Sequence, residues 1–523
     1  MAEQLSSSRV VARNAVFSVA GYLVSAAYLV ALLPIIVHFL GTEQFGLWSL
    51  VLAVTGYVGL VDLGLSTSFV KYVAEYVAQD QDDQVNSVVR HGFLFYLALS
   101  GLLLLVGFLA GRLVFPLLSV PPDQLELAWN AMMLALVAFG VNNLSFVFVS
   151  VLSGLQRLDA YNIFQTAVTS VRFLAIGLTL FLGGDLLAMM AADVAVSTAS
   201  LLPLWILTKR FFPSLSVRLG EFDAAMFSRL VRFGGQLQAS RLAEVVQTQF
   251  DKLLIARFLG LSLVGMYEFG SRPLARLRAF PMAAMAGLLP AMSALDSEDN
   301  QERILAGVVR STRYVIVFGL PVFTFVAVFA QPIVRVWLGE GFALAGIALQ
   351  ILAAGYLMSV VSAPLALAAQ GRGEPRFQMQ ATLTQAVLNI ILSLALIIAF
   401  GYAGAAAGTC LASITGSLLL IRLYGHRIMQ DPFATYGRIL ARPLLAAATG
   451  VSAGLAAGAL SSAWVGDQSR GEVLVGLIFS LGAFVLFYGL MVAKLRVLGP
   501  DDRGFLMNIL PSRLLLLFTR EKL

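Results

Sequence analysis

Long apolar segments separated by short loops dominate this sequence. A helix needs about 20 mainly apolar residues to cross the hydrocarbon core of a bilayer. Fourteen segments of the 523-residue chain meet this requirement, and they span residues 14–39, 46–77, 91–118, 127–154, 160–182, 184–208, 234–258, 264–292, 308–331, 343–369, 377–399, 402–425, 437–460 and 472–494. The pattern predicts an all-α integral membrane protein with about 14 transmembrane helices.

The charged residues fit a membrane protein and indicate its orientation. They make up only 12% of the chain, whereas soluble proteins carry about 25%. If the N-terminus is cytoplasmic, the inner loops and tails, with the span ends next to them, hold 25 Lys and Arg residues, and the outer loops with their span ends hold 4. Because Lys and Arg concentrate in cytoplasmic loops, we expect both termini in the cytoplasm. The net charge of +6 then reflects topology rather than nucleic-acid binding.

A short motif occurs twice, each time in the loop between two apolar segments. Residues 40–48 read Leu-Gly-x-x-x-Phe-Gly-x-Trp, and residues 259–267, which lie 219 positions later, read Leu-Gly-x-x-x-Val-Gly-x-Tyr. Arg13 and Arg232 have the same separation. Internal repeats around a central site are common in secondary transporters. The repeat therefore predicts two related six-helix lobes that move about a site between them.

The repeat and the loop lengths divide the chain into four predicted parts. Residues 1–208 form an N-terminal six-helix lobe, and residues 234–430 form a C-terminal six-helix lobe. Residues 431–523 add two transmembrane helices and a cytoplasmic amphipathic tail. In residues 209–233, which join the lobes, apolar side chains recur at roughly helical spacing with arginines among them. This composition is typical of a helix lying on the membrane surface, so we expect a cytoplasmic interfacial linker helix.

Polar and ionisable side chains within the spans are the candidate site residues, because such groups are costly in hydrocarbon and usually functional. A guanidinium group matches phosphate oxygens, and a carboxylate can carry a coupling proton. Candidates for substrate binding or cavity lining are Arg172, Arg241, Lys252, Arg272, Arg276, Asn142 and Asn143. Candidates for ion coupling or gating are Asp62, Glu244, Asp251 and Glu268. Most of these residues lie on the seventh and eighth predicted spans.

The same charges allow two interpretations. They are either ion pairs that hold helices together or groups that line a substrate cavity. At 1.5 Å per helical residue, Asp251 and Arg272 lie about 12 and 10 Å from the outer loop that they share, so we expect them to pair across adjacent helices. We also expect Glu244 to pair with Arg276. For Asp62, the structural alternative is a hydrogen bond to backbone at a helix bend.

Other kinds of chemistry lack their signatures in the sequence. There is no G-x-x-x-x-G-K-[ST] phosphate-binding loop, so we expect no nucleotide hydrolysis by that route. The three scattered histidines and the single Cys410 offer neither metal-ligand spacing nor a catalytic triad. We expect a protein that is not an enzyme and needs no cofactor or metal. An ion gradient, the membrane potential or removal of product would then drive its activity.

Several short motifs, taken together with the number and order of spans, point to one family. They are Arg13-Asn14, the repeated motif at 40–48 and 259–267, Asp62-Leu63-Gly64-Leu65 and Lys71-Tyr72. In these features the chain resembles the Wzx-type polysaccharide flippases of the multidrug/oligosaccharidyl-lipid/polysaccharide exporter (MOP) superfamily. The resemblance implies a MATE-like fold in which two six-helix bundles surround a central cavity and expose it alternately to the two sides of the membrane.

The resemblance also implies a substrate and a place. The substrate would be a polyprenyl-pyrophosphate-linked oligosaccharide, moved from the cytoplasmic to the outer leaflet of the cell inner membrane. The product would feed the biosynthesis of a cell-surface polysaccharide such as lipopolysaccharide. Implied partners are this lipid-linked oligosaccharide, the bilayer, and the polymerase and glycosyltransferases of the same pathway, but no nucleic acid.

Three alternatives remain open from the sequence. A lipid II flippase of peptidoglycan synthesis would also need a cationic cavity and can have fourteen spans. A small-molecule or cation antiporter of the same superfamily would depend on acidic residues, whereas arginines outnumber carboxylates in the eighth span. A membrane enzyme of polysaccharide assembly, such as a polymerase, is disfavoured by the short outer loops.

Overall fold

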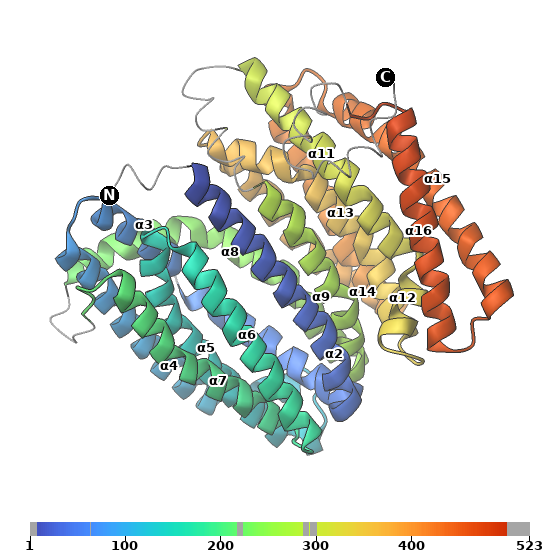
Figure 1. Cartoon of the computed structure of the whole chain (residues 1–523). Coiled ribbons are helices and arrows are strands. Elements are labelled where there is room, and N and C mark those ends of the chain that lie inside the picture. The colour runs from blue at the N-terminus through green and yellow to red at the C-terminus, as the bar shows by residue number, and fades with distance from the viewer. Residues whose placement is uncertain (1–7, 63, 217–222, 286–291, 293–300, 499–523) are drawn as a thin grey trace. The chain divides into compact units, whose positions relative to one another are not determined.

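A computed structural model describes residues 8–62, 64–216, 223–285, 292 and 301–498, and every regular element in these ranges is a helix (Figure 1). Ten of the described helices are long and apolar enough to cross a membrane. The prediction of an all-α membrane protein is therefore confirmed. The total of 14 spans stays a prediction, because by length and composition the structure supports ten.

The helices follow the predicted spans closely. Two of them contain a sharp bend, α2 at Gly41 (φ 77°, ψ 171°) and α14 at Gly401 (φ 59°, ψ −134°), so each accounts for two predicted apolar segments. The elements are α2 (Ser8–Val58), η1 (Gly59–Asp62), α3 (Leu65–Ala78), α4 (Asp82–Leu117), η2 (Pro122–Gln124), α5 (Leu125–Gly154), α6 (Leu158–Phe181), α7 (Leu186–Phe211), α8 (Ala224–Leu259), α9 (Leu261–Ala284), α11 (Gln301–Val328), α12 (Ala330–Trp337), α13 (Ala343–Gly371), α14 (Arg376–Ile428), α15 (Pro432–Val465) and α16 (Arg470–Lys494).

Three details differ from the sequence-based expectation. The second predicted span, 46–77, is interrupted by η1 and by Gly64, which has a left-handed φ of 70° and meets the backbone of Gly234. The linker expected at 209–233 is no separate helix in its second half, since α8 begins at Ala224 and continues through it. The short helix α12 was not predicted. Residues 217–222 and the tail from 499 onward lie outside the described part.

The chain divides into two compact units by its internal contacts. Unit 1 comprises residues 1–276 and 385–409, and unit 2 comprises residues 277–384 and 410–523. The central part of α14 therefore belongs to unit 1, while both of its ends belong to unit 2. The lobe boundaries predicted at 1–208 and 234–430 stay a prediction.

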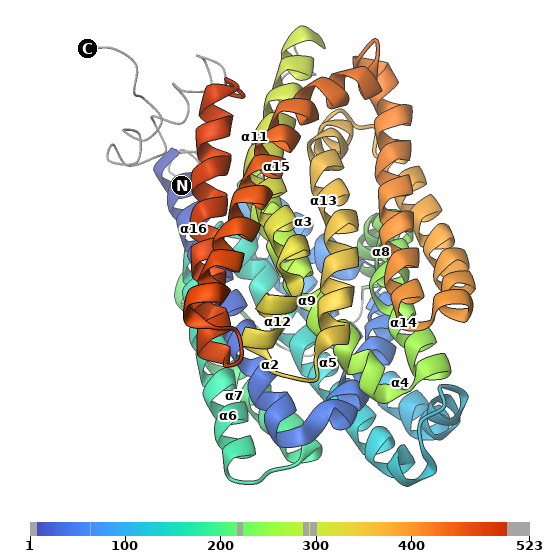
Figure 2. The same ribbon diagram turned by 90° about the vertical axis from the view of Figure 1, so that its right-hand side faces the viewer.

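In unit 2, the last two helices pack as a pair against α11 (Figures 1 and 2). The hydroxyl of Tyr488 on α16 donates a hydrogen bond of 2.8 Å to the carbonyl oxygen of Val317 on α11. Small residues allow α15 to approach α16 closely. A Cβ atom at Gly450 on α15 would lie 3.0 Å from the carbonyl oxygen of Phe484 on α16. Close approach at small residues is how helices associate in a bilayer, where apolar burial between helices contributes little.

In unit 1, the two copies of the repeated motif contact each other through their glycines. A Cβ atom at Gly46 would collide with the carbonyl group of Leu261, and one at Gly265 would lie 3.0 Å from the carbonyl oxygen of Thr42. Leu261 is the repeat counterpart of Thr42, and Gly265 is that of Gly46, at the same separation of 219. In each copy of the motif, the second glycine therefore allows the backbone of the other copy to pack closely against it.

This contact predicts a large cost for even one added methyl group. Gly46→Ala is expected to destabilise the protein by about 1–3 kcal/mol, because overpacking forces the backbone to shift. Gly177→Ala on α6 is the matched control, since nothing lies within 4 Å of its Cβ position. Thermal unfolding of the purified protein in detergent measures both. Equal stability of the two variants would contradict the role given to Gly46.

Candidate functional site

The candidate site is built on the turn between α8 and α9. Gly260 alone joins these helices, with φ 94° and ψ 170°. The turn brings Asp251 and Lys252 on α8 next to Tyr267 and Glu268 on α9. All four side chains are buried. Two carboxylates thus lie inside one helix pair, and their surroundings differ.

Asp251 is held in a cage of neutral polar groups and is only 2% exposed. Its Oδ2 atom accepts hydrogen bonds from the hydroxyl of Tyr267, at 2.7 Å, and from that of Thr409. Its Oδ1 atom accepts from Ser393 Oγ at 2.9 Å and from Asn389 Nδ2 at 3.2 Å. The cage therefore joins α8, α9 and the part of α14 that belongs to unit 1. Among the described residues, no Lys or Arg forms an ion pair with Asp251.

Glu268 is also fully buried, but two cations flank it. Lys252 Nζ pairs with Oε1, and Arg272 Nε pairs with Oε2 from one turn further along α9. Lys252 also donates a hydrogen bond of 2.8 Å to Gln249 Oε1. The guanidinium of Arg272 lies over the ring of Trp48, 4.8 Å from its centroid. Trp48 and Tyr267 occupy the same place in the two motif copies, so the repeat itself contributes to both clusters.

The two carboxylates can therefore do different chemistry. Glu268 has its charge compensated by fixed cations, which is the arrangement of a buried structural ion pair. Asp251 has hydrogen-bond donors but no compensating cation in the described part of the chain. Because removing an isolated charge from water is costly, this cage favours a proton or a bound cation on Asp251. The hydroxyl and amide oxygens of the residues that form the cage are ligands that suit hard cations.

Arg172 and Asp62 lie outside these clusters. Arg172 Nε on α6 pairs with Asp193 Oδ1 on α7 at 2.6 Å, and its Nη2 donates to Ser197 Oγ at 2.9 Å. Asp62 in η1 accepts hydrogen bonds from the hydroxyl of Tyr96 at 2.6 Å and from Ser66 Oγ at 3.1 Å. Both residues connect neighbouring elements of unit 1, and their roles in gating or substrate binding stay predictions.

The remaining candidates are placed as follows. Asn142 on α5 and Glu244 on α8 are exposed, and Asn143 is partly buried. Arg276 on α9 is exposed. The side chain of Arg241 lies outside the described residues. The expected pair of Glu244 with Arg276 stays a prediction.

The expected pair of Asp251 with Arg272 is wrong. Arg272 pairs with Glu268 on its own helix, one turn away, and Asp251 is satisfied by the neutral cage. The depth of the two residues along their helices does not determine which way each side chain points. An i, i+4 partner on the same helix is reached without any interhelical contact.

Sequence reasoning also missed the neutral members of the cage. Asn389 and Ser393 are four residues apart on α14, and Thr409 lies beyond the bend at Gly401. The available signal was the i, i+4 spacing of two polar residues in an apolar span, which places both on one helix face. The neutral candidates taken from the sequence, Asn142 and Asn143, lie on another span.

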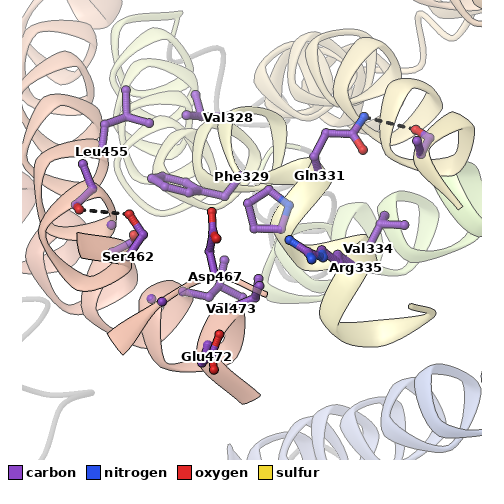
Figure 3. Close-up of a pocket in the computed structure, with 18 of the residues that line it drawn as sticks. Val328, Phe329, Gln331, Val334, Arg335, Leu455, Ser462, Asp467, Glu472 and Val473 are labelled. Atoms are coloured by element: carbon purple, nitrogen blue, oxygen red, sulfur yellow. Dashed lines mark hydrogen bonds between the residues drawn. The ribbon is translucent and has the colours of Figure 1, made fainter. Parts of the chain in front are cut away.

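Unit 2 contains a pocket of about 440 Å³ that the sequence did not predict (Figure 3). Phe329 and Leu455 contribute apolar walls. Its charged groups are largely occupied: Arg335 Nε pairs with Glu340 at 2.6 Å. The carboxylate of Glu472 accepts hydrogen bonds from the backbone N–H groups of Gln468 and Ser469, just before α16. We assign this pocket no role in transport.

Comparison with known proteins identifies a family and several similar proteins. The profile of the family described as "Polysaccharide biosynthesis protein" matches residues 11–296, and the MatE profile matches residues 238–395. A Shigella flexneri protein described as "Putative O-antigen transporter" is 23% identical over 419 residues, which cover 79% of this chain and 97% of that protein.

Two solved structures show the fold. An inward-facing multidrug resistance MATE family transporter of the MOP superfamily has a TM-score of 0.68 at 14% identity, covering 78% of this chain and 94% of that chain. The lipid II flippase MurJ, in an inward closed conformation, has a TM-score of 0.67 at 14% identity, covering 92% of this chain and 99% of that chain. The MATE-like fold expected from the resemblance is confirmed, and the protein is a multi-pass membrane protein.

Proposed function

Because this chain belongs to the polysaccharide biosynthesis protein family, we propose that it is a flippase for a lipid-linked oligosaccharide. The relative from Shigella flexneri is described as an O-antigen transporter and aligns over most of both chains, which supports this class of substrate. The observation that carries the transport mechanism is the buried, caged Asp251. A carboxylate in such a place is a natural carrier of a coupling ion.

The proposal has a finer form. The substrate is a polyprenyl-pyrophosphate-linked oligosaccharide, carried from the cytoplasmic to the outer leaflet of the cell inner membrane for cell-surface polysaccharide biosynthesis. Lobes formed by residues 1–208 and 234–430 expose the substrate site to each side in turn. The protein itself makes and breaks no covalent bond. Glycosyltransferases of the same pathway supply the substrate, and the polymerase of that pathway uses it after transfer.

Arginines are the proposed contacts for the pyrophosphate. Arg272 uses Nε for Glu268, so its two terminal nitrogens remain for a second acceptor. The side chain of Arg272 is 20% exposed and its guanidinium lies over the ring of Trp48, and the side chain of Arg172 is 29% exposed. A guanidinium fixed by a carboxylate and an aromatic ring is pre-oriented for planar, bidentate binding of phosphate oxygens. Arg276 on the same helix extends the cationic stripe by one turn.

Coupling is proposed to operate at Asp251. With a proton or Na⁺ bound, the carboxylate is neutralised and the cage holds α8, α9 and the centre of α14 together. Without it, the buried charge is compensated only by neutral hydrogen-bond donors, which disfavours the same arrangement. Occupancy of Asp251 thereby changes the stability of contacts between these three helices.

The first test determines the leaflet in which the lipid-linked oligosaccharide accumulates. In a strain lacking the gene, the substrate should accumulate in the cytoplasmic leaflet, and expression of the wild-type chain should restore its exposure on the outer leaflet. Protection of the sugar from an impermeant labelling reagent measures this. If outward transfer is normal without the gene and only unpolymerised units accumulate outside, the protein acts at a later step.

The second test addresses the arginines. The triple variant Arg172→Gln, Arg272→Gln and Arg276→Gln should fail to restore outer-leaflet exposure, although it is present in the membrane. Arg422→Gln, Arg438→Gln and Arg442→Gln is the matched control, because it removes the same charge from exposed positions. Full complementation by the first triple variant would exclude these arginines as substrate contacts.

A second candidate function is a lipid II flippase. The observation behind it is the similarity of fold to MurJ, which covers 92% of this chain. Complementation of a strain depleted of its lipid II flippase tests this alternative. Growth on expression of this chain would favour it, whereas restoration of a surface polysaccharide alone would favour the oligosaccharide substrate.

A further inference from the structure

A second cationic site lies far from the Asp251 cage, where α3 packs against the beginning of α8. A pocket of about 350 Å³ opens here, lined by Tyr72, Ala225, Ser228, Arg229, Arg232 and Phe233. At 1.5 Å per residue, Arg232 lies roughly 30 Å along α8 from Asp251. The distribution of basic residues predicts this end of unit 1 to be cytoplasmic. The pocket is therefore not part of the proposed transport site.

The walls of this pocket are fixed by tight packing between α3 and α8. Ser68 Oγ on α3 donates a hydrogen bond of 2.8 Å to the carbonyl oxygen of Leu230 on α8, and both residues are buried. The rings of Tyr72 and Phe233 meet edge to face at 6.1 Å. A site supported by packed helices holds its side chains more precisely than one on a loop.

Cationic groups converge on these walls. Arg229 donates a hydrogen bond of 3.0 Å from Nη1 to the hydroxyl of Tyr76, and this contact orients its guanidinium. Arg232 follows one turn later on the same face of α8 and is exposed. Lys71 Nζ lies 4.4 Å from the ring centroids of both Tyr72 and Phe233. Two arginines therefore line the pocket, and Lys71 lies against the two aromatic rings of its wall.

The backbone N–H groups at the N-terminus of α8 are not the groups that would bind an anion in this pocket. Asp223 caps this helix, and its Oδ1 accepts the backbone N–H groups of Ala225 at 2.9 Å and Met226 at 3.1 Å. These two hydrogen bonds, that to Met226 foremost, lower the pKa of Asp223 below its ordinary value. The helix end is thus already satisfied by an ionised carboxylate. Among the described residues, Glu75 on α3 is exposed, and it does not line the pocket as the two arginines do.

We propose that this pocket binds a phosphate group, carried by a membrane lipid or by a free phosphate compound. Two guanidinium groups can each offer paired N–H donors to phosphate oxygens, and Ser228 adds a hydroxyl. Arginines that only set membrane orientation need no common pocket, no aromatic wall and no fixed geometry. The proposal does not depend on the flippase activity.

Binding is tested with the purified full-length chain in a neutral detergent. Its thermal unfolding midpoint is followed during titration with inorganic pyrophosphate, with phosphatidylglycerol, and with phosphatidylcholine as the zwitterionic reference. Sodium chloride at matched ionic strength controls for general screening. A ligand that binds only the folded state raises the midpoint in a saturable way.

Three variants locate the effect. Arg229→Gln with Arg232→Gln should weaken the apparent affinity for the binding probe by roughly tenfold or more, because charge-assisted hydrogen bonds are lost. Arg229→Lys with Arg232→Lys keeps the charge but not the planar fork, and should bind with intermediate affinity. Arg438→Gln with Arg442→Gln removes two exposed arginines from α15 and should bind like the wild type.

The outcomes distinguish the sources of phosphate. Saturable binding of pyrophosphate supports a site for free or terminal phosphate groups, and binding of phosphatidylglycerol alone supports a lipid headgroup site. In both cases, the apparent affinity must fall by roughly tenfold or more in the Arg229→Gln, Arg232→Gln variant. The proposal is overturned if neither probe stabilises the wild type beyond sodium chloride. It is also overturned if both glutamine double variants respond equally.

Discussion

The Asp251→Asn variant is expected to lose ion-driven transport by roughly 100-fold or more while remaining folded, in line with the loss of a proton-transfer group. Asparagine has nearly the same shape as aspartate, and the hydroxyls of Tyr267 and Thr409 can turn to accept hydrogen bonds from its amide. What the substitution removes is the charge that a proton or cation would neutralise. Because the wild-type cage contains no compensating cation in the described residues, unfolding should not become easier.

Transport of lipid-linked oligosaccharide in proteoliposomes measures this effect. An imposed pH gradient and an imposed Na⁺ gradient are applied separately, so that the gradient driving the wild type identifies the coupling ion. Ser393→Ala, which removes one ligand and keeps the carboxylate, is expected to reduce transport less than Asp251→Asn. Gradient-driven transport at the wild-type rate by Asp251→Asn would exclude this residue from coupling.

Glu268→Gln is expected to have the largest effect on stability, with a loss of about 3–5 kcal/mol of unfolding free energy. The substitution leaves the buried Lys252 and the partly buried Arg272 without their shared carboxylate. Breaking a buried ion pair on one side is costly because the remaining charge stays uncompensated. Denaturant or thermal unfolding in mixed micelles, together with the amount of folded protein after purification, measures the loss.

The matched control is Glu340→Gln, which breaks another glutamate–arginine pair. Glu340 is 76% exposed in its pair with Arg335, so its loss should cost no more than about 1 kcal/mol. Adding Lys252→Met to Glu268→Gln removes one uncompensated cation and should restore part of the stability. If Glu268→Gln is as stable as Glu340→Gln, the Glu268 cluster is not a structural ion pair.

Sequence patterns predicted the fold well because membrane spans obey simple constraints. Apolar length and glycine placement located the helix boundaries, and the bends at Gly41 and Gly401 lie where adjacent spans were separated. The break after Val58 was not predicted as a helix end, although a bend was one of the two interpretations of Asp62. Its cause is the close approach of Gly64 to Gly234, and such a contact depends on the tertiary structure.

The candidate site was predicted only in part. Asp251, Lys252, Glu268 and Arg272 could be selected from the sequence because each is a charged residue in an apolar span, and the structure places them on one helix pair. Their pairing could not be predicted, because it depends on how each helix is rotated. Asn389 comes from a helix more than a hundred residues away and carries no charge. Its contribution to the cage could be recognised only once α14 was placed in space.

The glycine contact between the two motif copies has an implication for how the repeat arose. Gly46 receives Leu261, and Gly265 receives Thr42, so each half of the contact is the image of the other. Reciprocal contacts of this kind define the isologous interface of a twofold homodimer. A half-length ancestor carrying one copy would have been able to pair with itself through this surface. Gene fusion would then have preserved the dimer contact inside a single polypeptide, leaving each copy free to acquire its own aromatic residue, Trp48 or Tyr267.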